Sequence, residues 1–176
     1  MKLHLLPAFT VIIALCGCQP KAPSAATTEA DQSPASDSPA PLGTAESPRK
    51  ITIEAGDAMK FSLTRIDAFP GEILRITLLN TGRAPVEAMG HNWVLLRPGT
   101  DLAAYSNAAV RAAKPDYLPA ELSASVLAHT RMLGGGAKDS VLVTVPADST
   151  PGTEFPFLCT FPAHFQLGMK GVLVVR

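Results

Sequence analysis

The stretch Cys159–Met169, which reads CTFPAHFQLGM, lies near the carboxyl end of the chain. It places one cysteine, one histidine and one methionine among residues that are otherwise mostly apolar or small. His164 comes five residues after Cys159, and Met169 comes five residues after His164. Thiolate, imidazole and thioether together form a soft, mixed set of metal ligands. The stretch therefore predicts a transition-metal site on one loop, with a further ligand from another part of the chain.

The sequence around this loop has the alternating pattern of short β-strands, separated by turn signals such as Asn80-Thr-Gly82 and Arg97-Pro-Gly99. Only 100–114, which is rich in alanine and is followed by Pro115, is predicted to be helical. The expected fold class is all-β, a Greek-key β-sandwich with one helical insertion near 100–114. The seven expected strands are Ile51–Ile53, Met59–Leu63, Ile73–Leu79, Trp93–Leu96, Val141–Val145, Glu154–Leu158 and Val172–Val175.

The beginning of the chain is predicted to be an export signal and not part of the fold. Lys2 supplies a positive charge, and Leu5–Leu15 is an apolar run too short to span a membrane as a stable helix. The run ends in Leu15-Cys16-Gly17-Cys18, which is similar to a bacterial lipobox, where the last cysteine is lipidated. We therefore predict a lipoprotein signal peptide over 1–17 and lipidation of Cys18. An ordinary secretory signal cut near Gly17 is the alternative.

Residues 18–48 are predicted to be the lipidated cysteine followed by a disordered tether. From Gln19 to Pro48 there are thirty residues, of which twenty-one are Ala, Pro, Ser or Thr. Such a segment buries too little apolar surface to offset the entropy of ordering it. The folded domain is therefore expected over 49–176. Because Gln19 does not resemble an inner-membrane retention signal, the expected location is the outer membrane facing the periplasm, with display at the cell surface as the alternative.

The metal site needs a second histidine, and the chain has four histidines in all. His4 leaves with the signal, and His129 is read as a hydrogen-bonded histidine at a strand end. His91 stands directly ahead of an apolar strand and completes a set of two histidines, one cysteine and a nearby methionine. Cys159 would be the one free thiol of the exported domain, without a disulfide partner. Two His and one Cys in a trigonal plane, with a weak axial Met, is the arrangement of blue copper.

Several segments resemble azurin, a member of the cupredoxin family, over most of the region from Ile51 to Arg176. They are Met89–Leu95, Ala128–Thr130, Lys138–Val141, Cys159–Pro162 and Met169–Gly171. The resemblance implies one type 1 copper ion as the cofactor. Its equatorial ligands would be His91, Cys159 and His164, its axial ligand Met169, and its weak opposite contact the carbonyl of Gly90.

The resemblance also assigns roles to residues around the ligands. Asn92 would tie the two ligand loops together and hydrogen-bond toward the thiolate sulfur, with Thr160 and Phe161 beside it. The sequence departs from azurin in three places. The loop has one more residue between His164 and Met169, as in plastocyanin and auracyanin, and the azurin disulfide has no counterpart. Asn80 stands where azurin has a titrating histidine, so we expect no proton-linked shift in potential that depends on that group.

The function implied by these features is a periplasmic-type electron-transfer protein, not an enzyme, which is anchored to a membrane by its lipid. We expect weak, transient contacts with redox partner proteins such as c-type cytochromes or periplasmic reductases. His164 is expected to reach the surface through an apolar patch, which comprises Phe161, Pro162, Phe165 and Leu167.

Other functions find less support in the sequence. With 15 basic and 15 acidic residues and no basic cluster, the chain offers no electrostatic surface for nucleic acid. A Cys–His hydrolase would leave Met169 without a role, a binuclear copper centre would need a second cysteine on the loop, and zinc prefers four comparable ligands. Copper storage or delivery with the same ligands stays open as the alternative.

Overall fold

The structure is a computed structural model that describes residues 42–114 and 116–176. The expected signal peptide 1–17, the lipidated Cys18 and most of the expected tether lie outside these residues. Within the described ranges, none of the helices is both long enough and apolar enough to cross a bilayer.

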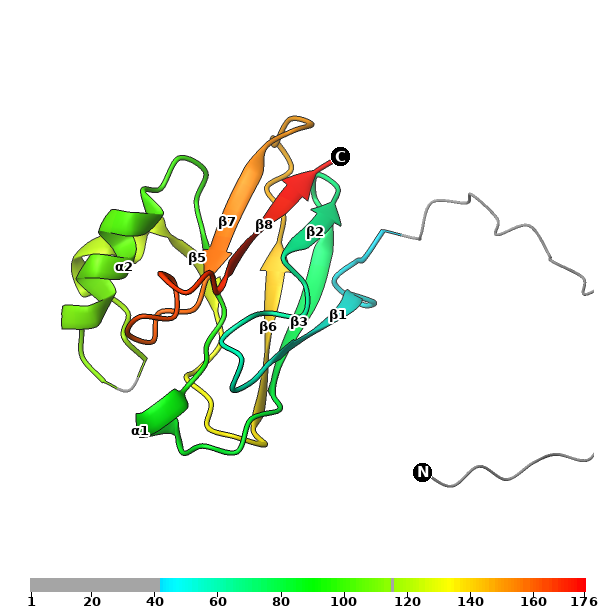
Figure 1. The fold of residues 1–176 in the computed structure, drawn as a ribbon. Coiled ribbons are helices and arrows are strands. Elements are labelled where there is room, and N and C mark those ends of the chain that lie inside the picture. The colour runs from blue at the N-terminus through cyan, green and yellow to red at the C-terminus, as the bar shows by residue number, and fades with distance from the viewer. Residues whose placement is uncertain (1–41, 115) are drawn as a thin grey trace, which may run out of the picture. The chain divides into compact units, whose positions relative to one another are not determined.

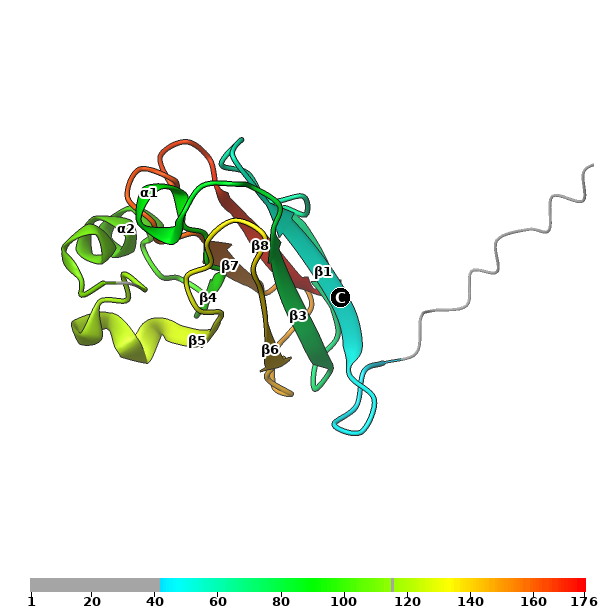
Figure 2. The same ribbon diagram turned by 90° about the horizontal axis from the view of Figure 1, so that it is seen from below.

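The described residues form eight strands in two mixed sheets that pack as a sandwich (Figure 1), so the predicted fold class is confirmed. Figure 2 shows the two sheets facing each other. Strands β1 and β3 pair in parallel, as do β2 and β8, and the other neighbours pair antiparallel. In spatial order, the first sheet contains β1 (Arg49–Ala55), β3 (Ile73–Asn80) and β6 (Lys138–Thr144). The second contains β2 (Arg65–Ala68), β8 (Lys170–Val175), β7 (Glu154–Leu158), β4 (Val94–Leu96) and β5 (Val126–His129).

The core between the sheets follows from the two-residue period of the strands. In β3, Leu74, Ile76 and Leu78 are fully buried, while the residues between them are partly exposed. Trp93, just before β4, is fully buried and lies against Phe157 of β7, with ring centroids 5.4 Å apart. Burial of these side chains supplies the main stabilisation of the sandwich.

The predicted helical insertion is α2 (Leu102–Arg111). Its first turn is capped by Asp101, whose carboxylate accepts hydrogen bonds from the backbone N–H groups of Ala103 and Ala104. The helix packs on the outer face of the second sheet through the fully buried ring of Tyr105. Two shorter elements were not expected, namely α1 (Val86–Met89) and a 3₁₀ helix over Ala120–Ser125.

The strands of the structure differ from the expected ones in three places. The expected strand Met59–Leu63 is wrong, because only Phe61 forms a β-bridge, with Ala55, and Met59 has a left-handed backbone (φ 53°) that interrupts extended structure. Strands β2 and β5 were missed. Both are short and contain residues that favour strands only weakly, namely Asp and Ala in RIDA (β2) and Ala in VLAH (β5).

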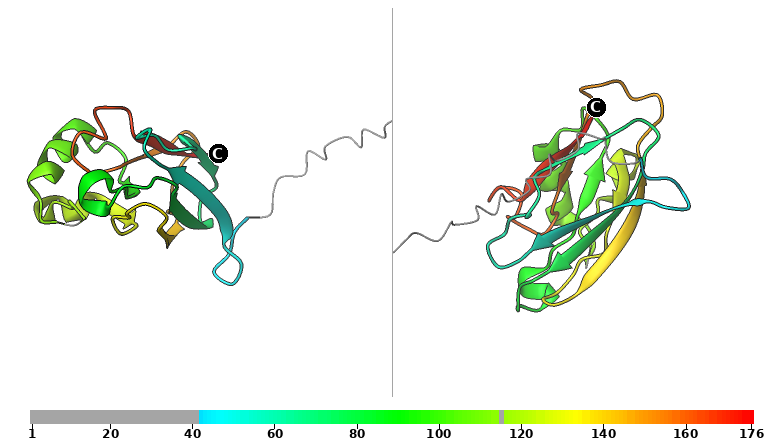
Figure 3. Two further views of the ribbon diagram at one scale, coloured as in Figure 1. Left: turned by 60° about the horizontal axis from the view of Figure 1, so that its bottom comes forward. Right: turned by 90° about the vertical axis from the view of Figure 1, so that its right-hand side faces the viewer.

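The two ends of the sandwich carry different parts of the chain. At one end, the N–H of Ile73 donates to the carbonyl of Gly43 (3.0 Å), and the N–H of Arg176 donates to the carbonyl of Ala68 (2.8 Å). The described chain thus contacts the sandwich from Gly43 on, before the expected boundary at residue 49. At the other end lies the loop Cys159–Met169, close to α1, as Figures 1 and 3 show.

Candidate metal centre

The loop Cys159–Met169 connects β7 to β8 and is closed by its own backbone hydrogen bonds. The N–H of Cys159 donates to the carbonyl of Met169 (3.1 Å), and the N–H of Met169 donates to the carbonyl of His164 (2.9 Å). Ala163 and Gly168 have left-handed backbones (φ 72° and 93°), which let the chain turn tightly on both sides of His164. The loop therefore holds its cysteine, histidine and methionine near one point.

His91 comes to this point from the segment between α1 and β4. It is paired with Leu133 by two hydrogen bonds, from His91 N–H to the Leu133 carbonyl (3.0 Å) and back (2.8 Å). Gly90 before it has no room for a side chain, since a Cβ there would lie 2.6 Å from the Val86 carbonyl and 2.8 Å from Met132. This close approach packs the backbone at Gly90 against the start of α1 and against Met132, and so fixes the segment that carries His91.

The structure brings the predicted ligands together in a buried cluster. One ligand atom each from His91, Cys159 and His164 lie within 4.8 Å of one another, and the Cys159 Sγ is 3.5 Å from the His164 Nδ1. Cys159 and Met169 are fully buried. Among the described residues, neither ring nitrogen of His91 has a hydrogen-bond partner, although both are buried. Unpartnered imidazole nitrogens beside a buried thiol and a thioether fit a copper ion.

The protonation of the cluster also suits a metal cation. Burial raises the pKa of the Cys159 thiol to about 12, while the backbone N–H groups of Asn92 and Phe161 act in the opposite direction. Burial, together with repulsion from His91, lowers the pKa of His164 to about 4. Burial also lowers the pKa of His91, against the opposing effect of the Gly56 carbonyl and the Asp57 carboxylate. Both imidazoles are therefore neutral near pH 7 and can bind a metal ion. The buried Cys159 thiol would lose its proton only beside a cation such as a bound metal ion.

The two ligand loops are joined by a buried hydrogen-bond network. The Asn92 side chain donates to the Thr160 hydroxyl (2.7 Å) and accepts from the Thr160 N–H (2.9 Å). The Asp116 carbonyl accepts from the Asn92 amide (3.1 Å) and from the Thr160 hydroxyl (2.9 Å). Sequence reasoning named Asn92 and Thr160 but missed Asp116, because its backbone carbonyl is the group used and any residue type carries one.

One expectation about His164 is wrong. The side chain was expected to reach the surface, yet the residue is only 2% exposed. The Phe161 ring packs against the His164 ring, with ring centroids 4.6 Å apart. Of the expected apolar patch, only Leu167 is largely exposed (53%), and the other three members are half-buried.

Two further residues lie outside the cluster. His129, in β5, is exposed, and its ring nitrogen lies 3.1 Å from the Thr130 carbonyl. Asn80 is buried, and its amide donates to the same Leu133 carbonyl that accepts from His91 (2.9 Å). Asn80 thus supports the segment that pairs with His91 and does so without a titratable group.

Comparison with known proteins agrees with this geometry. A model of copper-binding proteins of the plastocyanin/azurin family matches residues 47–176. Azurin of Pseudomonas fluorescens biotype A is 33% identical over 128 residues, which cover 72% of this chain and 98% of that azurin. Auracyanin-B of Chloroflexus aurantiacus is 38% identical over 122 residues, and the match spans 49% of that protein.

Solved structures give the same result. Auracyanin from the photosynthetic bacterium Roseiflexus castenholzii superposes with a TM-score of 0.62 and 36% identity, over 72% of this chain and 96% of that one. An azurin from Methylomonas sp. strain J has a TM-score of 0.62 and 27% identity, over 73% of this chain and 98% of that azurin. The chain belongs to the plastocyanin/azurin family of copper-binding proteins, which are electron carriers and not enzymes, and His91, Cys159, His164 and Met169 form its type 1 copper site.

Proposed function

We propose that this chain is an exported, lipid-anchored carrier that exchanges single electrons with redox proteins of the cell envelope. The observation that carries this proposal is the complete burial of the ligand cluster at the end of a stiff sandwich. A copper ion bound there would supply one-electron exchange between Cu(I) and Cu(II). The residues of the chain hold one ligand arrangement for both states, and this limits the reorganisation that slows electron transfer.

Residues around the ligands keep this arrangement fixed. The Asn92–Thr160 bonds lock the segment that carries His91 to the loop that carries Cys159. The Gly90 carbonyl belongs to the same fixed segment and would be a weak further contact to a bound copper ion. Apolar side chains such as Phe161 exclude water from the site, so the local dielectric stays low and uniform.

The position of the amino-terminal segment supports anchoring at that end. At the start of β3, the N–H of Ile73 donates to the carbonyl of Gly43. At the end of β3, the Asn80 side chain donates to the carbonyl of Leu133, the residue that pairs with His91. Eight residues of strand separate these points by about 25 Å. A lipid on Cys18 would therefore hold the sandwich by the end remote from the copper site. The ligand loop, at the other end of the sandwich, would stay free to meet partners such as c-type cytochromes or periplasmic reductases.

Contacts with these partners should be weak. The exposed apolar surface at the ligand loop is small, and Leu167 is its most exposed member. Small apolar contacts suit short-lived complexes better than permanent ones. Rapid dissociation is what a carrier needs, because it must leave one partner before it meets the next.

The test combines spectroscopy with kinetics on the copper-loaded protein. We expect an intense visible band that disappears on reduction and returns on oxidation, together with rapid electron exchange with a c-type cytochrome. Copper storage or delivery makes the opposite prediction. The ion would then pass to a Cu(I) chelator faster than the protein exchanges electrons, and that order of rates would overturn the proposal.

A further inference from the structure

Residues 132–136 form a backing segment behind the part of the chain that carries Gly90 and His91. The Leu133 backbone pairs with His91 through two hydrogen bonds, and the Met132 side chain packs against Gly90. A Cβ placed on Gly90 would lie 2.8 Å from Cγ and 3.0 Å from Sδ of Met132. The thioether side chain is therefore in direct contact with the backbone of the residue that precedes the ligand His91.

The backbone on both sides of this contact is fixed by hydrogen bonds. The carboxylate of Asp116 accepts from the N–H of Met132 (2.8 Å), and the Leu133 carbonyl accepts from the Asn80 amide (2.9 Å). Met132 is 8% exposed and Leu133 is 3% exposed. A methionine side chain is flexible in general, but here its backbone is held and its surroundings are packed. Met132 therefore acts as a fixed wedge against Gly90.

The glycines that follow bring the backing segment equally close to the chain ahead of α1. The N–H of Gly135 donates to the carbonyl of Ala84 (2.9 Å). A Cβ on Gly135 would lie 2.5 Å from the carbonyl oxygen of Gly82, so a residue with a side chain could not approach in this way. The backing segment thus contacts the chain both before and after α1.

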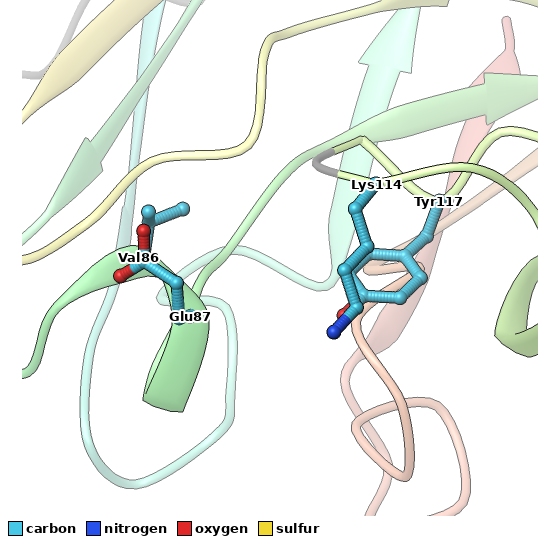
Figure 4. A pocket seen from close by; sticks show the side chains of 4 residues that line it. All are labelled: Val86, Glu87, Lys114 and Tyr117. Carbon is cyan, nitrogen blue, oxygen red and sulfur yellow. The ribbon is translucent and has the colours of Figure 1, made fainter.

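The helix α1 itself is weakly held. Each of its residues is at least partly exposed. Beside it lies a cleft of about 230 Å³, with Val86 and Glu87 of α1 on one side and Lys114 and Tyr117 on the other (Figure 4). The position of Gly90, which ends the helix, therefore depends on the backing segment and above all on Met132.

We propose that Met132 is a positioning residue that restricts the movement of the Gly90 carbonyl and so keeps the copper site easy to reduce. This inference rests on the proposed electron transfer at a bound copper ion. A carbonyl oxygen is a hard donor, which stabilises Cu(II) or Zn²⁺ more than Cu(I). Without the Met132 side chain, Gly90 is free to shift, and its oxygen can approach the ions that it binds better. Cu(II) is then stabilised relative to Cu(I).

The main experiment is a redox titration of the full-length copper-loaded protein. Met132→Ala removes the side chain, and Met132→Leu keeps its approximate volume. Leu74→Ala is the matched control, because Leu74 is a fully buried side chain of similar size at the start of β3, remote from the cluster. In Met132→Ala, we expect the affinity for Cu(II) relative to Cu(I) to rise about tenfold, which corresponds to a potential ~59 mV lower. Met132→Leu and Leu74→Ala should stay near the wild-type potential.

Two outcomes of this titration would overturn the inference. One is a Met132→Ala potential that equals that of Leu74→Ala, and the other is a Met132→Ala potential above that of the wild type. If Met132→Ala fails to fold, Met132→Val replaces it and should lower the potential in the same direction.

A second comparison tests whether the hydrogen bond from Met132 to Asp116 holds the wedge. Asp116→Asn removes the charge but keeps an oxygen acceptor, and Asp116→Ala removes both. The backbone carbonyl of residue 116, which joins Asn92 and Thr160, is present in both variants. Both lose the same negative charge, so the hydrogen bond accounts for the difference between them. We expect a lower potential in Asp116→Ala than in Asp116→Asn, and equal potentials would refute the fixed wedge.

Two measurements on protein prepared without copper extend the test. In the metal-free protein, Met132→Ala should shift the N–H NMR signals of Gly90 and His91, whereas Leu74→Ala should leave them in place. Zinc prefers four comparable ligands, so competition with chelators should show a several-fold rise in the affinity of Met132→Ala for Zn²⁺ relative to Cu(I). Unshifted signals or an unchanged ratio of affinities would contradict the role of Met132. A wild-type protein that transfers no electrons would refute the proposed function itself, whereas equal potentials in wild type and Met132→Ala refute this inference alone.

Discussion

Removing the Thr160 hydroxyl should destabilise the protein by about 2–3 kcal/mol, since hydrogen bonds contribute about 1 kcal/mol each and an unpaired buried donor costs more. The hydroxyl accepts from the Asn92 amide and donates to the Asp116 carbonyl, and Thr160 is 2% exposed. Thr160→Val keeps the shape of the side chain, so no cavity contributes to the loss. It leaves one Asn92 N–H buried without a partner.

The measurement is urea unfolding of the metal-free protein, in which the midpoint should fall by about 1–2 M. Thr77→Val is the control, because the Thr77 hydroxyl makes a bond of similar length to Ser140 (2.9 Å) that is exposed to solvent. Its cost should stay below about 0.5 kcal/mol. Equal losses in the two variants would show that the network adds nothing beyond a surface hydrogen bond. The visible spectrum of the copper-loaded Thr160→Val protein then tells whether the ligand loops have moved.

Four other predictions concern the ligands, an ion pair and the anchor. Cys159→Ser should abolish the intense visible band, because that band comes from charge transfer between sulfur and copper, and a retained band would exclude Cys159 as a ligand. Met169→Gln should keep copper bound but lower the potential, because an oxygen ligand favours Cu(II) more than a thioether does, and an unchanged titration would place Met169 away from the metal. Burial alone would raise the pKa of Glu72, but hydrogen bonds from Arg49 and from the N–H groups of Phe69 and Gly43 outweigh this effect and hold the pKa below its usual range. The stability from Glu72 is therefore present above the pKa of the unfolded chain and lost as pH falls through the folded value, so acid unfolding from about pH 5 downward should flatten in Glu72→Gln. Cys18→Ser should move the protein from the membrane to the soluble fraction, or leave it uncleaved, with the visible spectrum unaltered, and wild-type protein without an acyl mass on its amino terminus would contradict the lipobox interpretation.

The ligand set could be predicted from the sequence because its chemistry is local. Cys159, His164 and Met169 share one short loop, and soft ligands at such spacing have few other uses. Only His91 had to be chosen from elsewhere, and its place just before an apolar strand indicated it. The β-sandwich could be predicted for a similar reason, because the alternation of buried and exposed residues is visible within each strand on its own.

Features that depend on contacts between distant segments could not be predicted. Asp116 acts through its backbone carbonyl, which no residue type signals, and Tyr117 adopts a backbone that its side chain disfavours. Met59–Leu63 has the apolar content of a strand, but a left-handed residue at its start prevents more than one bridge. In each case the tertiary structure overrode the local preference.

The burial of His164 has a consequence that joins these features. The sequence indicated that the ligand loop Cys159–Met169 was largely apolar. The apolar side chains of such a loop either lie exposed or pack against the ligands. Here Phe161 packs against the ligand ring. Tyr117 packs against Phe161 in turn, and it follows Asp116, whose carbonyl is bonded to both ligand loops. The same hydrogen bonds that join the two ligand loops therefore also hold the segment that packs on the Phe161 ring. Thr160→Val should therefore disturb this packing as well as lower the stability. The ring-proton NMR signals of Phe161 in the metal-free protein should shift, and signals that stay in place would contradict this reasoning.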